Sequence, residues 1–210
     1  VPTLDDLKLP AILAELAMER KGLILVIGMT GSGKSTTLAA MLDHRNKNSY
    51  GHILSIEDPV EFVHKHQNCI VSQREVGVDT DCWQNAIKSA LRQAPNVVLI
   101  GEIRDAEAMD YALQFAETGH LCVATIHATN CIQAIERIVN LFPTEKQHQV
   151  FMNLSLNLKA IVGQRLIKLE AGKGRAPAME ILLNTSTIAD YIFKQQLEPI
   201  REAMVKSSDL

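Results

Sequence analysis

The sequence predicts an α/β fold in which a mainly parallel β-sheet is flanked by helices on both faces. Two observations predict this fold: short apolar runs alternate with stretches of helical spacing along the 210 residues, and the first apolar run leads straight into a glycine-rich loop. A hydrophobic fraction of 47% is sufficient to fill one sizeable core. Ligands of such sheets bind beyond the carboxyl ends of the strands, so the polar residues that follow each strand are the candidates for function.

Five apolar runs in the first part of the chain are predicted to be strands of the sheet. They occupy residues 23–27, 52–57, 68–73, 97–100 and 121–126. Between them, residues 36–42 begin a helix, and apolar side chains recur at helical spacing over residues 82–92 until Pro95 ends that helix. Asp105 is expected to cap a further helix that continues to about Thr118.

The remainder of the chain is predicted to contain two helices, a hairpin and a final helical region. The helices are expected at residues 131–141 and 144–162, and the hairpin strands at residues 164–169 and 177–183 around a turn with Gly172 and Gly174. From Thr185 the apolar side chains return to helical spacing. We therefore expect one core domain over residues 1–184 and the start of a C-terminal helical region over residues 185–210.

The composition excludes several classes of protein. A net charge of -3 and an aromatic fraction of 4% argue against a protein that binds nucleic acid through bulk charge or base stacking, so no direct nucleic-acid partner is expected. No apolar run reaches membrane-spanning length, and no signal peptide opens the chain. The cysteines show no metal-type spacing and are expected to be reduced thiols of a cytoplasmic protein: Cys69, Cys82, Cys122 and Cys131.

Residues 28–35 read Gly-Met-Thr-Gly-Ser-Gly-Lys-Ser, which is a complete phosphate-binding loop between a strand and a helix. The glycines let the backbone N–H groups turn toward an anion, and the helix N-terminus adds partial positive charge. Lys34 can reach the outer phosphates of a nucleotide, and the Ser35 hydroxyl can bind Mg²⁺. The residues expected to contact the nucleotide are Thr30, Gly31, Ser32, Gly33, Lys34, Ser35 and Thr36.

Carboxylates follow two of the predicted strands. Glu102 follows the strand at residues 97–100 in a Walker B arrangement, where it can bind Mg²⁺ directly or through water. Considered without the phosphate loop, a glutamate in this position could equally be a solvated loop residue. The strand at residues 52–57 ends in Glu57-Asp58-Pro59-Val60-Glu61, three carboxylates that need a positive neighbour such as a metal–phosphate group. We expect Glu61 to orient the attacking water, the alternative being an acidic surface turn.

Two histidines bracket the strand at residues 121–126. His127 follows its carboxyl end, where the ligand is expected, and is predicted to sense the γ-phosphate; a histidine in a sequence is otherwise most often structural or exposed. His120 stands at the opposite end and is expected to support packing or a subunit contact. Arg74 and Arg104 are expected near the ligand, but the sequence does not say which arginine would act across subunits.

These motifs together resemble the secretion-type ATPase family, which drives type II secretion and type IV pilus assembly and retraction. Within this family, the residues of these motifs are most similar to those of the retraction motors of twitching motility, of the PilT/PilU type. The resemblance implies a RecA-like P-loop NTPase core, a homohexamer, Mg²⁺ and ATP, with Glu61 as catalytic carboxylate, Glu102 in Walker B and His127 in a nucleotide-sensing motif. The matching segments are 28–35, 56–61, 73–77, 101–105, 117–121 and 125–128.

Two departures from the family refine this expectation. The family carries an amino-terminal PAS-like domain that supplies arginines to the neighbouring site, and the chain as given begins after it, so we expect a fragment that is weak or inactive as an ATPase alone. PilT-type motors carry Ala-Ile-Arg-Asn-Leu-Ile-Arg-Glu where residues 187–194 here have Ala189 and Phe193 in place of both arginines. This favours the accessory, PilU-like branch.

The expected function is therefore an ATP-hydrolysing motor subunit that powers or assists pilus retraction. Its expected partners are a PilT-type retraction ATPase and the inner-membrane pilus platform protein, with the motor in the cytoplasm, peripheral to the inner-membrane machinery. The alternatives are a RecA-like nucleic-acid translocase or helicase, and a type II secretion assembly ATPase. A non-enzymatic nucleotide-binding subunit is disfavoured by the intact Lys34, Glu61 and Glu102, and a switch GTPase by the lack of an Asn-Lys-x-Asp segment.

Overall fold

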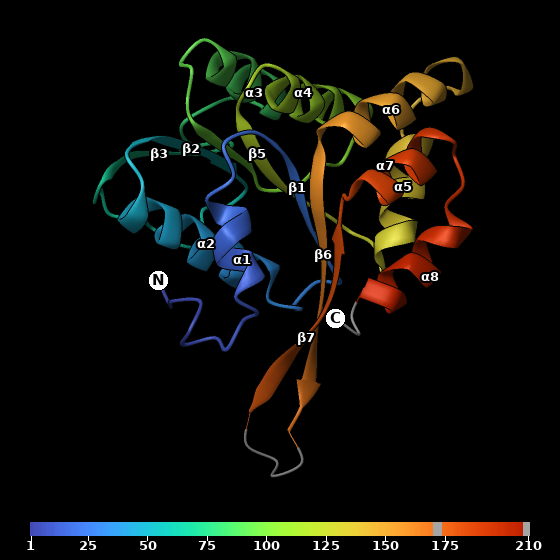
Figure 1. The fold of residues 1–210 in the computed structure, drawn as a ribbon. Helices are drawn as coiled ribbons and strands as arrows, with labels where there is room; N and C mark the ends of the chain where they lie inside the picture. The colour runs from blue at the N-terminus through green and yellow to red at the C-terminus, as the bar shows by residue number, and fades with distance from the viewer. Residues whose placement is uncertain (170–173, 208–210) are drawn as a thin grey trace.

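The computed structural model describes residues 1–169 and 174–207. Its centre is one seven-stranded sheet in the order β3-β2-β4-β5-β1-β6-β7, in which all neighbouring strands are parallel except the antiparallel pair β6 and β7 (Figure 1). The predicted mainly parallel α/β fold is thus confirmed. The strands are β1 (Gly22–Ile27), β2 (Gly51–Glu57), β3 (Cys69–Glu75), β4 (Val97–Ile100), β5 (Leu121–Ile126), β6 (Leu158–Lys168) and β7 (Arg175–Leu183).

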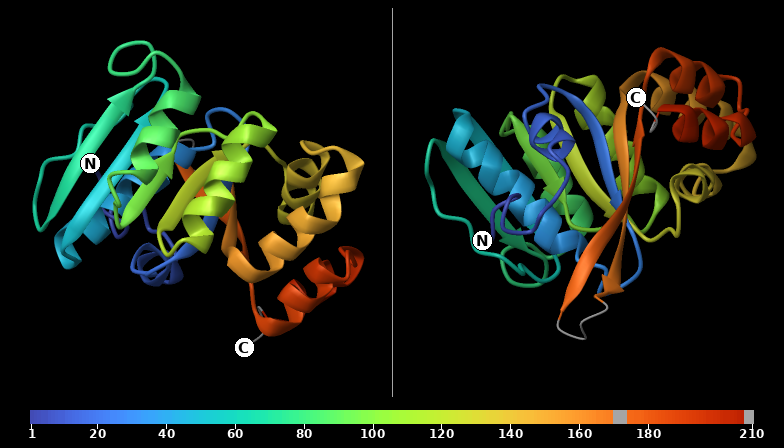
Figure 2. Two further views of the ribbon diagram at one scale, coloured as in Figure 1. Left: turned by 90° about the horizontal axis from the view of Figure 1, so that it is seen from above. Right: turned by 60° about the horizontal axis from the view of Figure 1, so that its bottom comes forward.

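Helices cover both faces of the sheet (Figure 2). One apolar cluster joins the sheet to α1 (Ile12–Ala17) and α2 (Lys34–Asn48). A second apolar cluster, on the other face, contains buried side chains of the remaining helices. These are α3 (Trp83–Leu91), α4 (Ala106–Glu117), α5 (Cys131–Asn140), α6 (Thr144–Asn157), α7 (Ser186–Phe193) and α8 (Glu198–Ser207).

Burial on two faces explains why the central strands are uniformly apolar. Every residue of β1, β4 and β5 is buried, because helices pack above and below them. A strand of this kind needs apolar side chains at every position and shows no alternation. This is the reason that short apolar runs located these strands in the sequence.

The helix predicted over residues 144–162 is wrong at its C-terminal end. Helix α6 ends at Asn157, and Leu158 begins β6 with extended backbone angles of φ -62° and ψ 136°. Residues from Leu158 to Gly163 pair in parallel with β1, and Ala160, Ile161 and Val162 are completely buried. A fully buried strand and a buried helix segment look alike in sequence, and the free edge of β1 decides between them.

The antiparallel hairpin of β6 and β7 is confirmed, and its far end extends beyond the rest of the sheet (Figure 1). The strands are longer than predicted, since they pair from Ala160–Leu183 to Lys168–Arg175. The predicted turn residue Gly172 lies outside the described residues. Helix α1 was not expected from the sequence, although its Leu13 is completely buried against α2 and the sheet.

The C-terminal helical region forms as predicted, as α7 and α8. Ile188, Ile192 and Ile200 are buried in the same apolar cluster as α3 to α6. The predicted boundary between a core domain and a C-terminal region, at residues 184 and 185, stays a prediction. All four cysteines are free, and burial raises the pKa of Cys122 and Cys131 far above the ordinary range. Among the described helices none is long and apolar enough to cross a membrane.

Candidate functional site: a phosphate-loop cleft

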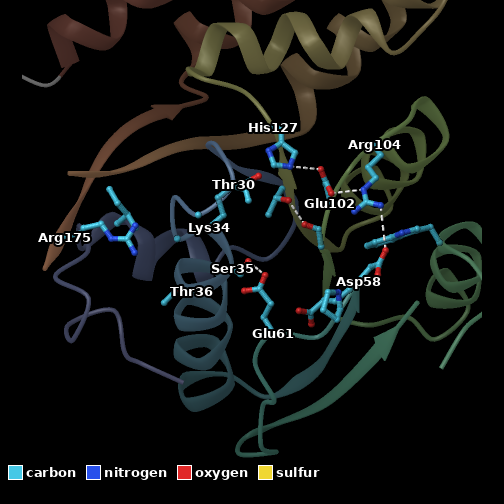
Figure 3. Close-up of a pocket in the computed structure, with 18 residues that line it drawn as sticks. Thr30, Lys34, Ser35, Thr36, Asp58, Glu61, Glu102, Arg104, His127 and Arg175 are labelled. Carbon is cyan, nitrogen blue, oxygen red and sulfur yellow. Dashed lines mark hydrogen bonds and ion pairs between the residues drawn. The ribbon is translucent and has the colours of Figure 1, made fainter. Parts of the chain in front are cut away.

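The parallel strands β1, β2, β4 and β5 end at one edge of the sheet, and the segments that follow them surround a cleft of about 560 Å³. Most of the residues predicted to form the site line this cleft (Figure 3). They are Thr30, Gly31, Gly33, Lys34, Ser35, Thr36, Glu61, Glu102 and His127. Ser32 does not line it; its hydroxyl is buried and has no hydrogen-bond partner among the described residues.

The glycines of the loop are required by close approach and by backbone conformation. A Cβ on Gly28 would stand 2.5 Å from the backbone carbonyl oxygen of Gln164. A Cβ on Gly33 would stand 2.8 Å from the side-chain nitrogen Nε2 of the same residue. Gly33 also has φ +89°, in the left-handed region that favours glycine. Strand β6 therefore packs so tightly against the loop that side chains are excluded there.

Helix α2 begins at Lys34 without a side-chain cap and without an acidic residue in its first turn. The first N–H groups of a helix have no intrahelical partner, and here no capping side chain takes their place, so they face the cleft with the positive end of the helix dipole. The Lys34 ammonium donates hydrogen bonds to the carbonyl oxygens of Gly28 (2.8 Å) and Met29 (3.0 Å). Burial lowers the pKa of Lys34, while Glu102 and Glu61 act in the opposite direction. This arrangement is suited to binding an anion.

The acidic segment after β2 divides its carboxylates between two tasks. Glu57 lines the cleft, but its Oε1 accepts hydrogen bonds from Ser55 Oγ (2.7 Å) in β2 and Gln73 Nε2 (3.2 Å) in β3. Burial raises the pKa of Glu57, with these hydrogen bonds opposing the shift. Glu61 is exposed and accepts a hydrogen bond from Ser35 Oγ at 3.0 Å, across 26 positions of sequence. Glu61 is thus the carboxylate that reaches the loop.

Glu102 lies just past the end of β4, between the side chains of His127 and Arg104. Its Oε1 lies 2.8 Å from His127 Nε2, and its Oε2 accepts a hydrogen bond from Arg104 Nε at 2.7 Å (Figure 3). Arg104 also reaches Asp58, with 3.7 Å between Nη1 and Oδ2. The structure therefore brings Glu102 and His127 together, as the sequence predicted, and joins them to the acidic segment through Arg104.

Backbone contacts hold this end of the sheet in place. The Thr125 hydroxyl donates a hydrogen bond to the Gly101 carbonyl oxygen, and the Ile103 N–H donates to the Thr125 carbonyl oxygen at 2.9 Å. Asp105 caps α4 by accepting from the Ala108 N–H at 2.8 Å, as predicted. Glu102 and Arg104 therefore project from a short segment that is fixed on both sides.

The oxygen atoms in the cleft suit Mg²⁺ chemically, because a hard cation takes carboxylate, hydroxyl, water and phosphate oxygens. Ser35, Glu61 and Glu102 supply such oxygens. Within residues 1–169 and 174–207, no three His, Cys, Asp or Glu side chains are grouped so as to hold a metal alone. An ion bound here would therefore need nucleotide phosphates and water to complete its ligands, which is how Mg²⁺ is ordinarily bound with nucleotides.

Two further predicted residues lie away from the cleft. His120 Nδ1 is within hydrogen-bond distance of Thr118 Oγ1 (3.0 Å) and the Phe115 carbonyl (3.2 Å), and its ring meets Phe115 edge to face, so it supports packing as expected. Arg74, expected near the ligand, is not among the residues that line the cleft, whereas Arg104 is. The sequence reasoning missed Thr125, Leu166 and Arg175 as lining residues, because hairpin packing rather than a local motif places the last two.

Comparison with known proteins agrees with this geometry. A model of the Type II/IV secretion system protein family matches residues 5–199, nearly the whole chain. The chain belongs to this family. Over 209 residues it is 56% identical to the type IV pilus ATPase PilU of Pseudomonas aeruginosa, covering 100% of this chain and 55% of the relative. It is 43% identical to PilT of the same organism, named a type IV pilus retraction ATPase, covering 100% of this chain and 61% of the relative.

The fold is also found in a solved member of the family. The crystal structure of the pilus retraction motor PilT with bound ADP superposes with a TM-score of 0.94 at 45% identity, covering 97% of this chain and 59% of the PilT chain. The predicted family resemblance, including its PilT/PilU character, is confirmed. The chain spans between a half and two thirds of the length of these three relatives.

Proposed function

We propose that the chain is the nucleotide-hydrolysing core of a type IV pilus retraction ATPase of the PilU kind. The observation that carries the proposal is the 56% identity to PilU along the whole of the chain. The cleft supports it independently, since the loop, the acidic segment and the end of β4 converge there. Nucleotide binding is further supported by the ADP found with the PilT motor that has the same fold.

In this proposal the chain binds Mg·ATP and transfers the γ-phosphoryl group to water. The N–H groups at the start of α2 and the Lys34 ammonium hold the phosphates, and Ser35 and Glu102 hold Mg²⁺, which neutralises charge on the phosphates. Glu61 orients the attacking water and accepts its proton, while His127 responds to the presence of the γ-phosphate through its contact with Glu102.

The proposal extends to the surroundings in which the protein works. The full-length protein forms a homohexamer on the cytoplasmic side of the inner-membrane pilus machinery, contacts the platform protein, and assists a PilT-type retraction ATPase. An amino-terminal PAS-like domain supplies arginines to the neighbouring site. The accessory role is supported by Ala189 and Phe193, which stand where PilT-type motors have arginines.

The test compares two substitutions in the natural-length protein. Lys34→Ala removes the charge that faces the outer phosphates and should abolish tight binding of Mg·ATP in calorimetry. Glu61→Gln should leave binding nearly unchanged and lower turnover by roughly 10²-fold or more. Deletion of the gene should impair twitching motility, and neither variant should restore it. Equal ATP affinity in Lys34→Ala and the parent would contradict the assignment of the loop.

A further inference from the structure

Arg104 connects the two acidic parts of the cleft. Its Nε donates to Glu102 Oε2 at 2.7 Å, and its Nη1 lies 3.7 Å from Asp58 Oδ2 (Figure 3). Glu102 follows β4 and Asp58 follows β2, so a single guanidinium spans two neighbouring strand ends. Asp58 lies three positions before Glu61 in the same short segment. Arg104 thereby links the segment that carries Glu61 to Glu102.

The carboxylate of Glu102 has a partner on each oxygen. His127 Nε2 lies 2.8 Å from Oε1, and Arg104 occupies Oε2. These two contacts from opposite sides fix the rotation of the carboxylate as well as its position. Neither His127 nor Arg104 reaches Ser35, so the cleft-facing oxygens of Ser35 and Glu61 form a separate pair. Arg104 is the described side chain that relates the Glu102 group to the acidic segment.

Stability does not account for this arrangement. The Arg104 side chain is 56% exposed and Asp58 42% exposed, and exposed ion pairs of this kind contribute little to folding because water screens them. The backbone of Arg104 is already fixed by its neighbours, since Ile103 is buried and Asp105 caps α4. The Arg104–Asp58 contact therefore contributes little to the fold, and its effect is on the positions of side chains in the cleft.

We propose that Arg104 is a positioning residue, which sets the Glu102 carboxylate and the segment bearing Glu61 at the separation needed for metal binding and water orientation. The inference rests on the proposed function. A guanidinium is suited to this task because it is planar and can donate in two directions at once, whereas an ammonium is a point charge. Partners that orient metal-binding groups are commonly worth about 10- to 100-fold in metal affinity or activity.

The experiment measures Mg²⁺ dependence in the natural-length protein. For Arg104→Ala we expect the Mg²⁺ concentration for half-maximal ATP hydrolysis to rise roughly 10-fold and the maximal rate to fall about 10-fold or more. A second readout is ADP affinity by calorimetry. Relative to the parent, Arg104→Ala should bind ADP more weakly in the presence of Mg²⁺ and equally well when a chelator removes Mg²⁺. Arg104→Lys keeps the charge but not the planar group that contacts both Glu102 and Asp58, so its Mg²⁺ dependence should lie between those of Arg104→Ala and the parent.

Asp58 provides a test of the bridge itself. Asp58→Asn should cause a smaller loss than Arg104→Ala, and the double variant should be no worse than Arg104→Ala, because both remove the same connection. The matched control is Lys194→Ala, which breaks another exposed ion pair, 2.7 Å from Asp190 in α7 and remote from the cleft. It should leave the Mg²⁺ dependence unchanged.

Three results would overturn the inference. Arg104→Ala could behave like Lys194→Ala, it could lose ADP affinity equally with and without Mg²⁺, or its losses could add fully to those of Asp58→Asn. A parent protein that hydrolyses no ATP would instead remove the proposed function, and this inference with it. If the parent hydrolyses ATP and Arg104→Ala has the same Mg²⁺ dependence as the parent, only the inference about Arg104 is wrong.

Discussion

Glu57 and Glu61 are four positions apart and have the same side chain, yet their surroundings give them different chemistry. Glu57 is half-buried and bound by Ser55 and Gln73, whereas Glu61 is exposed and bound by Ser35. Both carboxylates line the cleft, but Glu57 Oε1 already accepts two hydrogen bonds from side chains in β2 and β3, whereas Glu61 contacts the phosphate loop through Ser35. At the scale of single residues, the hydrogen-bond partners and burial of each side chain therefore distinguish the members of an acidic cluster.

The pH dependence of stability tests this division. Burial raises the pKa of Glu57 above its ordinary value of 4.5, so the folded protein holds that proton more strongly than the unfolded chain does. Stability from this residue is therefore fully present below pH 4.5 and is lost as the pH rises through the raised pKa. Glu57→Gln is neutral at every pH and its amide oxygen can still accept from Ser55, so it should avoid this loss.

The measurement is urea unfolding of Glu57→Gln and the parent between pH 4 and pH 7. The variant should gain stability relative to the parent as the pH increases across this range. A difference that is the same at every pH would show that the charge of Glu57 is not disfavoured in the folded protein.

At the scale of elements, the contact between α2 and β6 positions the phosphate loop. Thr37 in the first turns of α2 donates a hydrogen bond to Gln164 Oε1 in β6 at 2.7 Å, and both side chains are buried. The Gln164 backbone lies against Gly28, at the start of the loop. Strand β6 thus supports both ends of the loop, and its pairing with β1 is what brings it there.

Thr37→Val keeps the shape of the side chain and removes its hydroxyl. The buried Gln164 oxygen would lose its partner, so the free energy of unfolding should fall by about 1–3 kcal/mol. Because Gln164 packs against the loop, nucleotide affinity should fall as well. Thermal unfolding and ADP calorimetry measure the two effects.

Thr129→Val is the matched control for this prediction. Thr129 donates to Gln133 Oε1, also at 2.7 Å, but this pair is exposed, so water can replace the lost hydrogen bond. The control should cost much less stability and leave ADP affinity unchanged. Equal losses in the two variants would show that the contact between α2 and β6 does not hold the loop in place.

At the scale of the whole molecule, the candidate site lies at one edge of the sheet. The relatives are longer than the region that this chain matches. The chain covers 55% of PilU and 61% of PilT, so these two relatives contain regions that have no counterpart in residues 1–210. Transfer of a γ-phosphoryl group requires positive charge close to the transition state, and in related chemistry an arginine from a neighbour is worth about 10³-fold or more.

A protein of residues 1–210 alone should therefore hydrolyse ATP slowly and remain mostly monomeric in dilute solution. The natural-length protein should assemble as a ring and hydrolyse ATP faster per chain, by roughly 10³-fold if the neighbour supplies arginines. Light scattering and ATPase rates on both lengths measure this. If residues 1–210 alone hydrolyse ATP as fast as the natural-length protein, no arginine from outside these residues is required.

The sequence predicted the elements and residues whose signals are local. The loop at residues 28–35, the buried strands and the carboxylates that follow them are encoded in short stretches, because glycine conformation, apolar runs and strand-end charges depend on neighbouring residues. Parallel strand order then predicted one shared edge, and the structure places Lys34, Glu61, Glu102 and His127 around one cleft there.

Tertiary structure decided what local signals leave open. Residues 158–162 form a strand because the edge of β1 offers hydrogen bonds, although their apolar pattern also fits a helix. Arg104 meets Asp58, and Thr37 meets Gln164, across 46 and 127 positions respectively, distances over which no periodicity carries information. The sequence alone determined that Lys34, Glu61, Glu102 and His127 belong to this sheet edge, whereas the tertiary structure added Arg175 to the cleft and left Arg74 outside its lining. Packing determined which of them touch, since contact depends on where distant elements come to rest.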